Sequence, residues 1–314
     1  GTSGTYTLTA TNASFAAGQK ILIHQTQGTG AGNKQYTSIQ SYTAGTITTT
    51  DLLNFSYSTG AQVRVMKQYT NITVNSGKTW SAKAWNGTVG GILAFYYNGT
   101  LTNSGTINLS GNDATTPSTG APGSGIGFDG GTGGNPNTLP GYVSYQGEGT
   151  VSGTQDKSAA TNGNGAGGST IDGNNGFSAG SGGGNRTVGA RGASGNTSVS
   201  GPGGLVTSSS DGSSITLGGG GAGASSPAGG AFLGGGAGAG ILIAIGATFN
   251  TSGGTIDLTG GSSIRSPDSQ GATGGGGAGG FAEILCDTAN LGTGKVLASG
   301  GTGQNAPYLG GTGG

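Results

Sequence analysis

Residues 91–111 have the sequence GILAFYYNGTLTNSGTINLSG, and the pattern returns at 240–260 (GILIAIGATFNTSGGTIDLTG) and at 280–300 (GFAEILCDTANLGTGKVLASG). Each copy begins with Gly and an apolar segment, passes through a polar turn with a second Gly, and ends in another short segment rich in β-branched or aliphatic residues. Apolar, β-branched segments bounded by Gly, Asn and Ser are typical of strands. The three copies therefore predict three units of strand, turn and strand.

A unit of this kind, repeated at fixed spacing, is typical of a β-solenoid, in which each coil buries its apolar edge by stacking on the next. In the second strand of the first copy, Ile107 and Leu109 share one face, whereas Asn108 lies on the other. The first strand is apolar on both faces in two of the copies, which indicates cover on both sides. We therefore expect an all-β protein with β-solenoid or β-helix-like coils and a further layer over them.

The candidate for this layer is the Gly-rich sequence between the copies, at 112–239 and 261–279. Two interpretations are open, because Gly-rich stretches form flexible linkers in many proteins. Extended Gly segments in the polyproline-II conformation can also approach closely enough to bond their backbones sideways. Since the coils need cover, we expect ordered polyglycine-II-type layers. The absence of a persistent Gly-X-Y period excludes collagen.

Composition excludes several classes of protein. Glycine supplies 77 of the 314 residues and charged residues only 7%. Because Gly is a poor helix former, such a chain cannot build long helices. The 11 basic residues balance the 11 acidic ones, so no basic surface is expected for nucleic acid or for an anionic membrane. The apolar runs are also too short for a membrane span. A net charge near zero favours self-association.

The first part of the chain predicts a compact β head, since it contains short alternating segments together with the only His and both Trp. We expect an N-terminal β domain at 1–90, followed at 91–314 by a Gly-rich solenoid-like domain with a long insert at 112–239. Cys286 follows an apolar run and is expected to be a core residue, which leaves the chain without an internal disulfide.

Catalysis is not expected. Any Ser-His-Asp site would need His24, the single histidine, and a polar residue on a half-buried strand is the simpler interpretation. Glu148 and Glu283 are the only glutamates and the Asp residues are scattered, so the paired carboxylates of a polysaccharide hydrolase are missing. No cofactor is expected, although Asp129 and Asp172 are candidate Ca²⁺ ligands because both lie in Gly-rich loops resembling calcium motifs.

With its Gly-Ile and Gly-Phe strand starts, its TINLSG-like second strands and its Gly-rich inserts, the chain resembles the glycine-rich surface proteins of bacteria and archaea. It resembles more loosely the adhesins and phage fibre tips with ordered polyglycine-II layers. The resemblance covers about two-thirds of the chain and implies a structural or adhesive role.

We therefore expect a non-enzymatic extracellular protein, the self-assembling subunit of a filament, sheath or surface layer, whose partners are copies of itself. Open coil ends carry unpaired strand groups that can accept the next copy. The alternative is a receptor- or glycan-binding adhesin module at a fibre tip. Ice binding is a third hypothesis, which the repeats do not support, because they do not place Thr at one site of successive coils.

Aromatic and apolar residues near the two expected ends are candidate assembly contacts: Trp80, Trp85, Tyr96, Tyr97, Tyr308 and Leu309. Three sequons are candidate glycosylation sites, which would fit a location at the cell surface: Asn71, Asn98 and Asn250.

Overall fold

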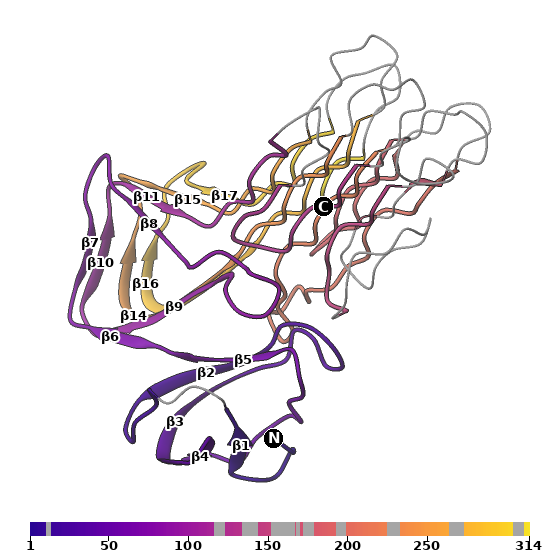
Figure 1. Ribbon diagram of the computed structural model, residues 1–314. Helices are drawn as coiled ribbons and strands as arrows, with labels where there is room; N and C mark the ends of the chain where they lie inside the picture. Colours follow the sequence, from indigo (N-terminus) through magenta and orange to yellow (C-terminus); the bar gives the residue numbers. More distant parts are fainter. Residues whose placement is uncertain are drawn as a thin grey trace.

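The structure is a computed structural model that describes residues 1–10, 14–115, 123–133, 144–151, 167, 170–171, 179–192, 199–224, 233–263, 273–303 and 311–314. These residues contain strands but no helix, which confirms the all-β class. Figure 1 shows three regions: an N-terminal sheet, a stack of parallel strands beside it, and a bundle of extended segments that leads away from the stack.

The N-terminal sheet is antiparallel and has the strand order β1-β4-β3-β2-β5. Its strands are β1 (Thr7–Thr9), β2 (Lys20–Gln25), β3 (Lys34–Thr43), β4 (Thr46–Thr49) and β5 (Ala61–Val65). The long strand β3 pairs with β2 in its first half and with β4 in its second, and the register shifts between Ile39 and Ser41. Because such an irregularity bends a strand, the sheet curls into a half-barrel. Apolar side chains fill its inner face: Leu8, Phe15, Ile21, Ile23, Ile39, Ile47, Leu53 and Tyr57.

Four successive segments of the chain form the parallel stack. Tier 1 consists of β6 (Lys67–Tyr69), β7 (Ile72–Val74) and β8 (Thr79–Ser81), and tier 2 of β9 (Ile92–Tyr97), β10 (Thr100–Asn103) and β11 (Thr106–Asn108). Tier 3 consists of β14 (Ile241–Asn250) and β15 (Thr255–Asp257), and tier 4 of β16 (Phe281–Asn290) and β17 (Val296–Leu297). Neighbouring tiers pair in parallel.

The three sequence repeats lie side by side in register, as tiers 2, 3 and 4. Ile241 pairs with Ile92 on one side and with Phe281 on the other, and Ile107 pairs with Ile256. Residues that share a place in the repeat therefore share a row in the stack. Tier 1 precedes the repeats, and its sequence does not share their pattern. As a result, strands on both sides of residue 90 belong to the same sheets.

The glycine bundle consists of extended segments that form no strands, at 123–133, 144–148, 179–192, 218–224, 233–240, 258–263, 273–280, 300–303 and 311–314. A single bridge joins Ala224 to Leu233. Its central segment, 218–224, donates backbone hydrogen bonds in three directions with a period of three residues. Every third N–H bonds the same neighbour: residues 218, 221 and 224 reach 233–239, residues 219 and 222 reach 181–184, and residues 220 and 223 reach 145–148. Its carbonyls accept from three further segments, at 128–131, 275–278 and 167. A period of three is that of an extended helix with three residues per turn.

Only glycine fits at many positions in the bundle. A Cβ on Gly221 would lie 2.2 Å from the carbonyl oxygen of Gly275, and one on Gly277 would lie 2.0 Å from that of Ala237. Alanine occurs where a methyl group has room, as at Ala222 and Ala278, which are fully buried. The bundle is thus held by backbone hydrogen bonds between segments in close contact.

The expected β-solenoid is wrong. The described strands lie in separate sheets, one of them the half-barrel, and β12 (Thr170–Ile171) and β13 (Val199–Ser200) form an isolated antiparallel pair. Where they are described, the Gly-rich segments add no strands to the parallel sheets. The reason is that glycine has no side chain to line the inside of a coil, so these segments bond to neighbours in several directions instead of to one tier above and one below.

Candidate functional site

Tier 1 leaves one end of the parallel stack open. Each of its strands pairs only with tier 2 among the described residues, so the other edge of each strand is free. A depression of about 420 Å³ lies at this end, lined by Tyr69 and Trp80 together with Asn71, Asn75 and Lys78. The rings of Tyr69 and Trp80 meet edge to face, with centroids 6.4 Å apart. The end therefore presents aromatic surface beside amide and ammonium groups.

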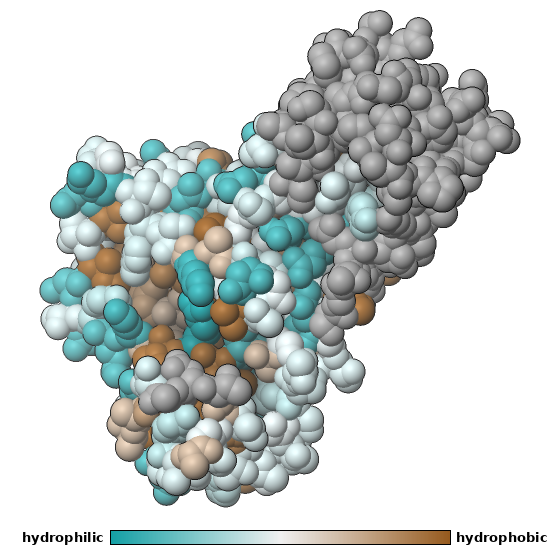
Figure 2. All heavy atoms as spheres, viewed as in Figure 1, coloured by the Kyte–Doolittle hydropathy of each residue, from teal (hydrophilic) through white to brown (hydrophobic). Residues whose placement is uncertain are grey.

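Tier 4 leaves the opposite end open as well. Strand β16 pairs with β14, and β17 with β15, and within the described part of the chain neither has a second neighbour. Three large aliphatic side chains on these strands are exposed: Leu285 by 46%, Leu297 by 40% and Val296 by 36%. In Figure 2, apolar side chains on the side shown gather over the stack and where it meets the half-barrel, next to polar ones. Unpaired strands with exposed aliphatic residues are templates for a further strand.

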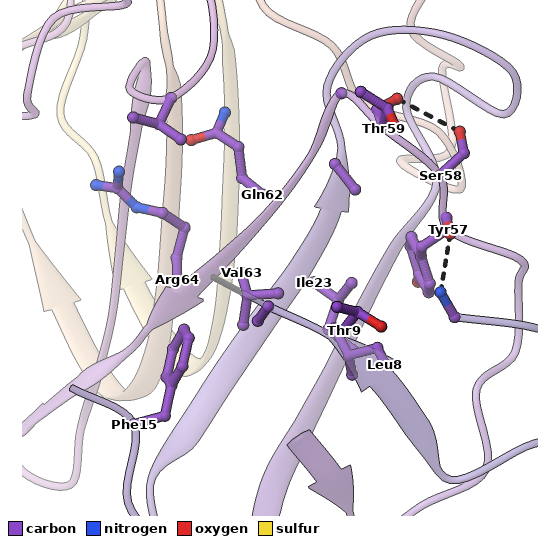
Figure 3. A pocket seen from close by; sticks show the side chains of 15 residues that line it. Leu8, Thr9, Phe15, Ile23, Tyr57, Ser58, Thr59, Gln62, Val63 and Arg64 are labelled. Carbon is purple, nitrogen blue, oxygen red and sulfur yellow. Dashed lines mark hydrogen bonds between the residues drawn. The ribbon is translucent and has the colours of Figure 1, made fainter. Parts of the chain in front are cut away.

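The half-barrel has an open seam between its edge strands β1 and β5. A groove of about 720 Å³ lies there, and Figure 3 shows Leu8, Ile23, Val63 and Phe15 around it. The pairing of β5 with β2 turns the backbone groups of Val63 toward the seam. The groove thus joins an apolar floor to free strand edges, and it can accept an extended segment or an apolar ligand.

Glu283, on β16, joins the stack to the half-barrel. Its carboxylate accepts hydrogen bonds from the Lys34 ammonium, at 2.5 Å, and from the Tyr36 hydroxyl, both on β3. Both partners come from about 250 residues earlier in the chain, and nothing in the sequence around Glu283 indicates them. Such a pairing occupies the carboxylate and holds two regions together.

Two further carboxyl groups lie where the bundle meets the head, that of Glu148 buried and that of Asp129 half-buried. The Glu148 carboxylate accepts hydrogen bonds from Trp85 Nε1 (2.8 Å), from Gln27 Nε2 (3.1 Å) and from the Asp129 amide (3.2 Å). Burial and the nearby Glu148 raise the pKa of Asp129 to about 7, and burial also raises the pKa of Glu148.

No group of three His, Cys, Asp or Glu side chains suited to a metal occurs among the described residues. Calcium binding at Asp129 stays a prediction, and Asp172 lies outside the described residues.

Replacing Asp129 by Asn is expected to stabilise the protein at alkaline pH only. The raised pKa of Asp129 means that its stabilising contribution is present below the unfolded pKa of 3.8 and is lost as the pH rises through about 7. The Asn side chain does not ionise, so the variant does not lose stability as the pH rises. Its melting temperature should therefore exceed that of the wild type at pH 8 and match it near pH 4. Thermal unfolding at both pH values measures the difference. If the melting temperatures of variant and wild type differed by the same amount at pH 4 and pH 8, the raised pKa of Asp129 would be contradicted.

His24 is more deeply buried than its sequence context predicts. It is fully buried, with Nδ1 2.9 Å from Thr26 Oγ1 and Nε2 2.8 Å from the carbonyl oxygen of Ile215. Burial lowers its pKa to about 4, with a smaller contribution from Lys34, so the ring is neutral at pH 7. Since a carbonyl only accepts, Nε2 carries the proton and Nδ1 accepts from Thr26.

The expected assembly residues divide by burial. Trp80 is half-buried at the open end of tier 1, and Tyr96 is half-buried on β9. Trp85 and Tyr97 are only 4% and 3% exposed, so they are core residues and are not available as surface contacts. Tyr308 and Leu309 lie outside the described residues.

The remaining expected positions are mostly at the surface. Asn71 and Asn98 are exposed, as glycosylation requires, whereas Asn250 is half-buried and its side chain accepts from the Ser252 amide. Cys286 is half-buried on β16 and packs against the core of the stack. No helix long and apolar enough to cross a membrane was found in the described parts of the chain.

Comparisons of the chain with protein families, with curated proteins and with solved structures find no match.

Proposed function

We propose that this chain is a non-enzymatic extracellular structural protein that assembles with copies of itself into a filament, sheath or surface layer. The observation that carries the proposal is the pair of open ends of one parallel stack, tier 1 and tier 4. Within the described part of the chain, each end has unpaired strand edges and exposed apolar side chains, and the two ends are opposite edges of the same set of sheets.

The tiers within one copy indicate how two copies would join. Tier 4 of one copy would pair in parallel with tier 1 of the next, as tier 2 pairs with tier 3. A contact between two different surfaces is heterologous, and repetition of such a contact gives an open fibre unless the rotation closes a ring. The net charge of zero removes long-range repulsion between copies.

The glycine bundle also supports a structural role. Its period of three, with bonds to neighbours on all sides, is the pattern of polyglycine-II-type layers, which we propose as its conformation. A body bonded in several directions resists bending and local opening, because each segment is tied to several others. These properties suit a load-bearing surface protein better than a soluble enzyme.

Assembly is tested by placing a charge on the exposed edge of tier 4. The Leu285→Lys variant should raise the protein concentration needed for polymerisation by about tenfold or more, because an edge lysine opposes strand addition. The matched control is Val188→Lys, since Val188 is 57% exposed and lies outside the stack. Sedimentation and negative-stain microscopy across a concentration series give the readout. A wild type that stays monomeric throughout, or an L285K variant that polymerises like it, would overturn the proposal.

A second candidate function is glycan binding at the same open end, as in an adhesin. The depression beside Tyr69 and Trp80 favours it, because sugars stack on aromatic rings and bond to amide and ammonium groups. In that case the wild type remains as single particles and binds glycans on an array. A Trp80→Ala variant loses this binding. The first proposal expects polymers and no glycan dependence, so the two are distinguishable.

A further inference from the structure

Three side chains of the half-barrel meet in a buried arrangement that the proposed function does not use. His24 and Gln62 face each other across β2 and β5. Thr26 follows His24 by two residues in extended chain, which places both side chains on the same side. Thr26 and His24 are fully buried, and Gln62 is 2% exposed.

Two of these side chains, with a main-chain carbonyl behind them, have the order of contacts that nucleophilic attack requires. The Thr26 hydroxyl donates to Nδ1 of His24 at 2.9 Å, and His24 is oriented by its Nε2–H bond to the Ile215 carbonyl at 2.8 Å. A hydroxyl, a neutral imidazole and an acceptor behind it form a nucleophile, a base and an orienting group.

The electrophile of this arrangement is the side-chain amide of Gln62. Gln62 Nε2 donates a hydrogen bond to Thr26 Oγ1 at 2.8 Å, which places the hydroxyl beside the carboxamide. Gln62 Oε1 accepts from the Gly90 N–H at 2.8 Å. This donor points at the oxygen on which negative charge would develop during attack on Cδ. Attack on Cδ requires the hydrogen bond from Nε2 to Thr26 to break and the carboxamide to rotate until its face meets the hydroxyl.

Gly90 is held in place for this contact. Its φ is +127°, a conformation that favours glycine, and a Cβ there would lie 2.1 Å from the Ala84 carbonyl oxygen. Its own carbonyl also accepts from Gln62 Nε2, at 3.1 Å. Gly90 therefore bonds both ends of the amide and keeps it beside Thr26.

We propose that Thr26 and Gln62 form an intramolecular ester cross-link, with His24 as the general base. Thr26 Oγ1 attacks Cδ of Gln62 while its proton passes to His24 Nδ1, and the tetrahedral oxyanion on Oε1 is stabilised by the Gly90 N–H. The Cδ–Nε2 bond then breaks as His24 returns the proton to Nε2, and ammonia leaves. One hydroxyl and one amide give one ester and one ammonia, so no oxidant or other reactant is needed.

The site also favours formation and survival of the ester. Holding the hydroxyl and the carboxamide side by side raises their effective concentration above that of free reactants. Released ammonia is protonated and diluted in water, which draws the reaction forward, and burial keeps water from the product. The cross-link would join the residue that follows β2 to the edge strand β5, across 36 residues, in a chain whose single cysteine allows no internal disulfide.

Mass spectrometry tests the cross-link on the whole protein. Purified wild type, denatured in acid, should weigh one ammonia less than its sequence requires. A digest should contain Thr26 and Gln62 in one joined peptide that hydroxylamine separates. The Thr26→Ser variant keeps a hydroxyl and should retain the mass loss, whereas Thr26→Val should show the full mass and His24→Gln should lose ammonia more slowly.

Two results would overturn the cross-link. One is an uncrosslinked digest of folded wild type at the full sequence mass. The other is a mass loss that persists in T26V, which would assign it to an asparagine succinimide. Because the peptide map of the wild type needs no variant, the test holds even if T26V fails to fold. The cross-link is independent of the polymerisation proposal, since the mass is measured on denatured single chains.

Discussion

A Gly221→Ala variant should melt about 10 °C below the wild type, because the added methyl group has nowhere to go. Its Cβ would lie 2.2 Å from the oxygen and 2.5 Å from the carbon of the Gly275 carbonyl. That carbonyl accepts the Gly236 N–H, so moving it breaks a bond to a third segment. Overpacking typically costs about 1–3 kcal/mol, and each lost hydrogen bond about 1 kcal/mol more.

Thermal unfolding followed by circular dichroism measures the change, with Gly253→Ala as the matched control. A Cβ on Gly253 would have its nearest neighbour at 3.4 Å, the Ser104 hydroxyl, which is ordinary contact. The control should therefore melt within 1–2 °C of the wild type, by the usual scale for a surface change of about 0.5 kcal/mol. If G221A melted at the same temperature as the control, the close backbone contacts described for the bundle would be contradicted.

Acid should destabilise the protein through His24 by about 3 kcal/mol, the value of a pKa shift from 6.5 to about 4. Because the folded pKa is depressed, the stabilising contribution is present above pH 6.5 and is lost as the pH falls toward 4. Asp129 opposes this trend, since its pKa is raised. The measurement is therefore best made in an Asp129→Asn background.

Urea unfolding at pH 7 and at pH 4 gives the two free energies of unfolding in that background. Adding His24→Gln removes the titrating ring, and the double variant should lose about 3 kcal/mol less on acidification than D129N alone. Titration of the other carboxyl groups affects both proteins and cancels in the comparison. Equal losses in the two proteins would show that His24 is not held neutral by burial.

The parallel stack could be predicted in part because its signal is local. The three repeats share their apolar and Gly positions, and rows such as Ile92, Ile241 and Phe281 pair as their alignment implies. Tier 1 was missed because its strands are short and lack the apolar run of the later copies. The expected solenoid was wrong because glycine segments that bond in several directions carry no periodic side chain from which their packing could be predicted.

The buried polar sites could not be predicted from the sequence. His24, Gln62 and Gly90 lie far apart in the chain, and Gly90 is one of 77 glycines, so nothing marks it as a hydrogen-bond donor to a side chain. The bond between Lys34 and Glu283 likewise depends on how the half-barrel docks on β16. The one local signal is the two-residue spacing of His24 and Thr26, which indicates a shared side in extended chain but no third partner.

The way in which the bundle is held together bears on how the protein responds to temperature. Its segments lose mainly peptide surface to one another on folding, and exposure of polar surface lowers the heat capacity of unfolding, whereas apolar exposure raises it. The free energy of unfolding of this region should accordingly curve little with temperature. Such a body would keep its rigidity both in the cold, where hydrophobic cores weaken, and well above ambient conditions.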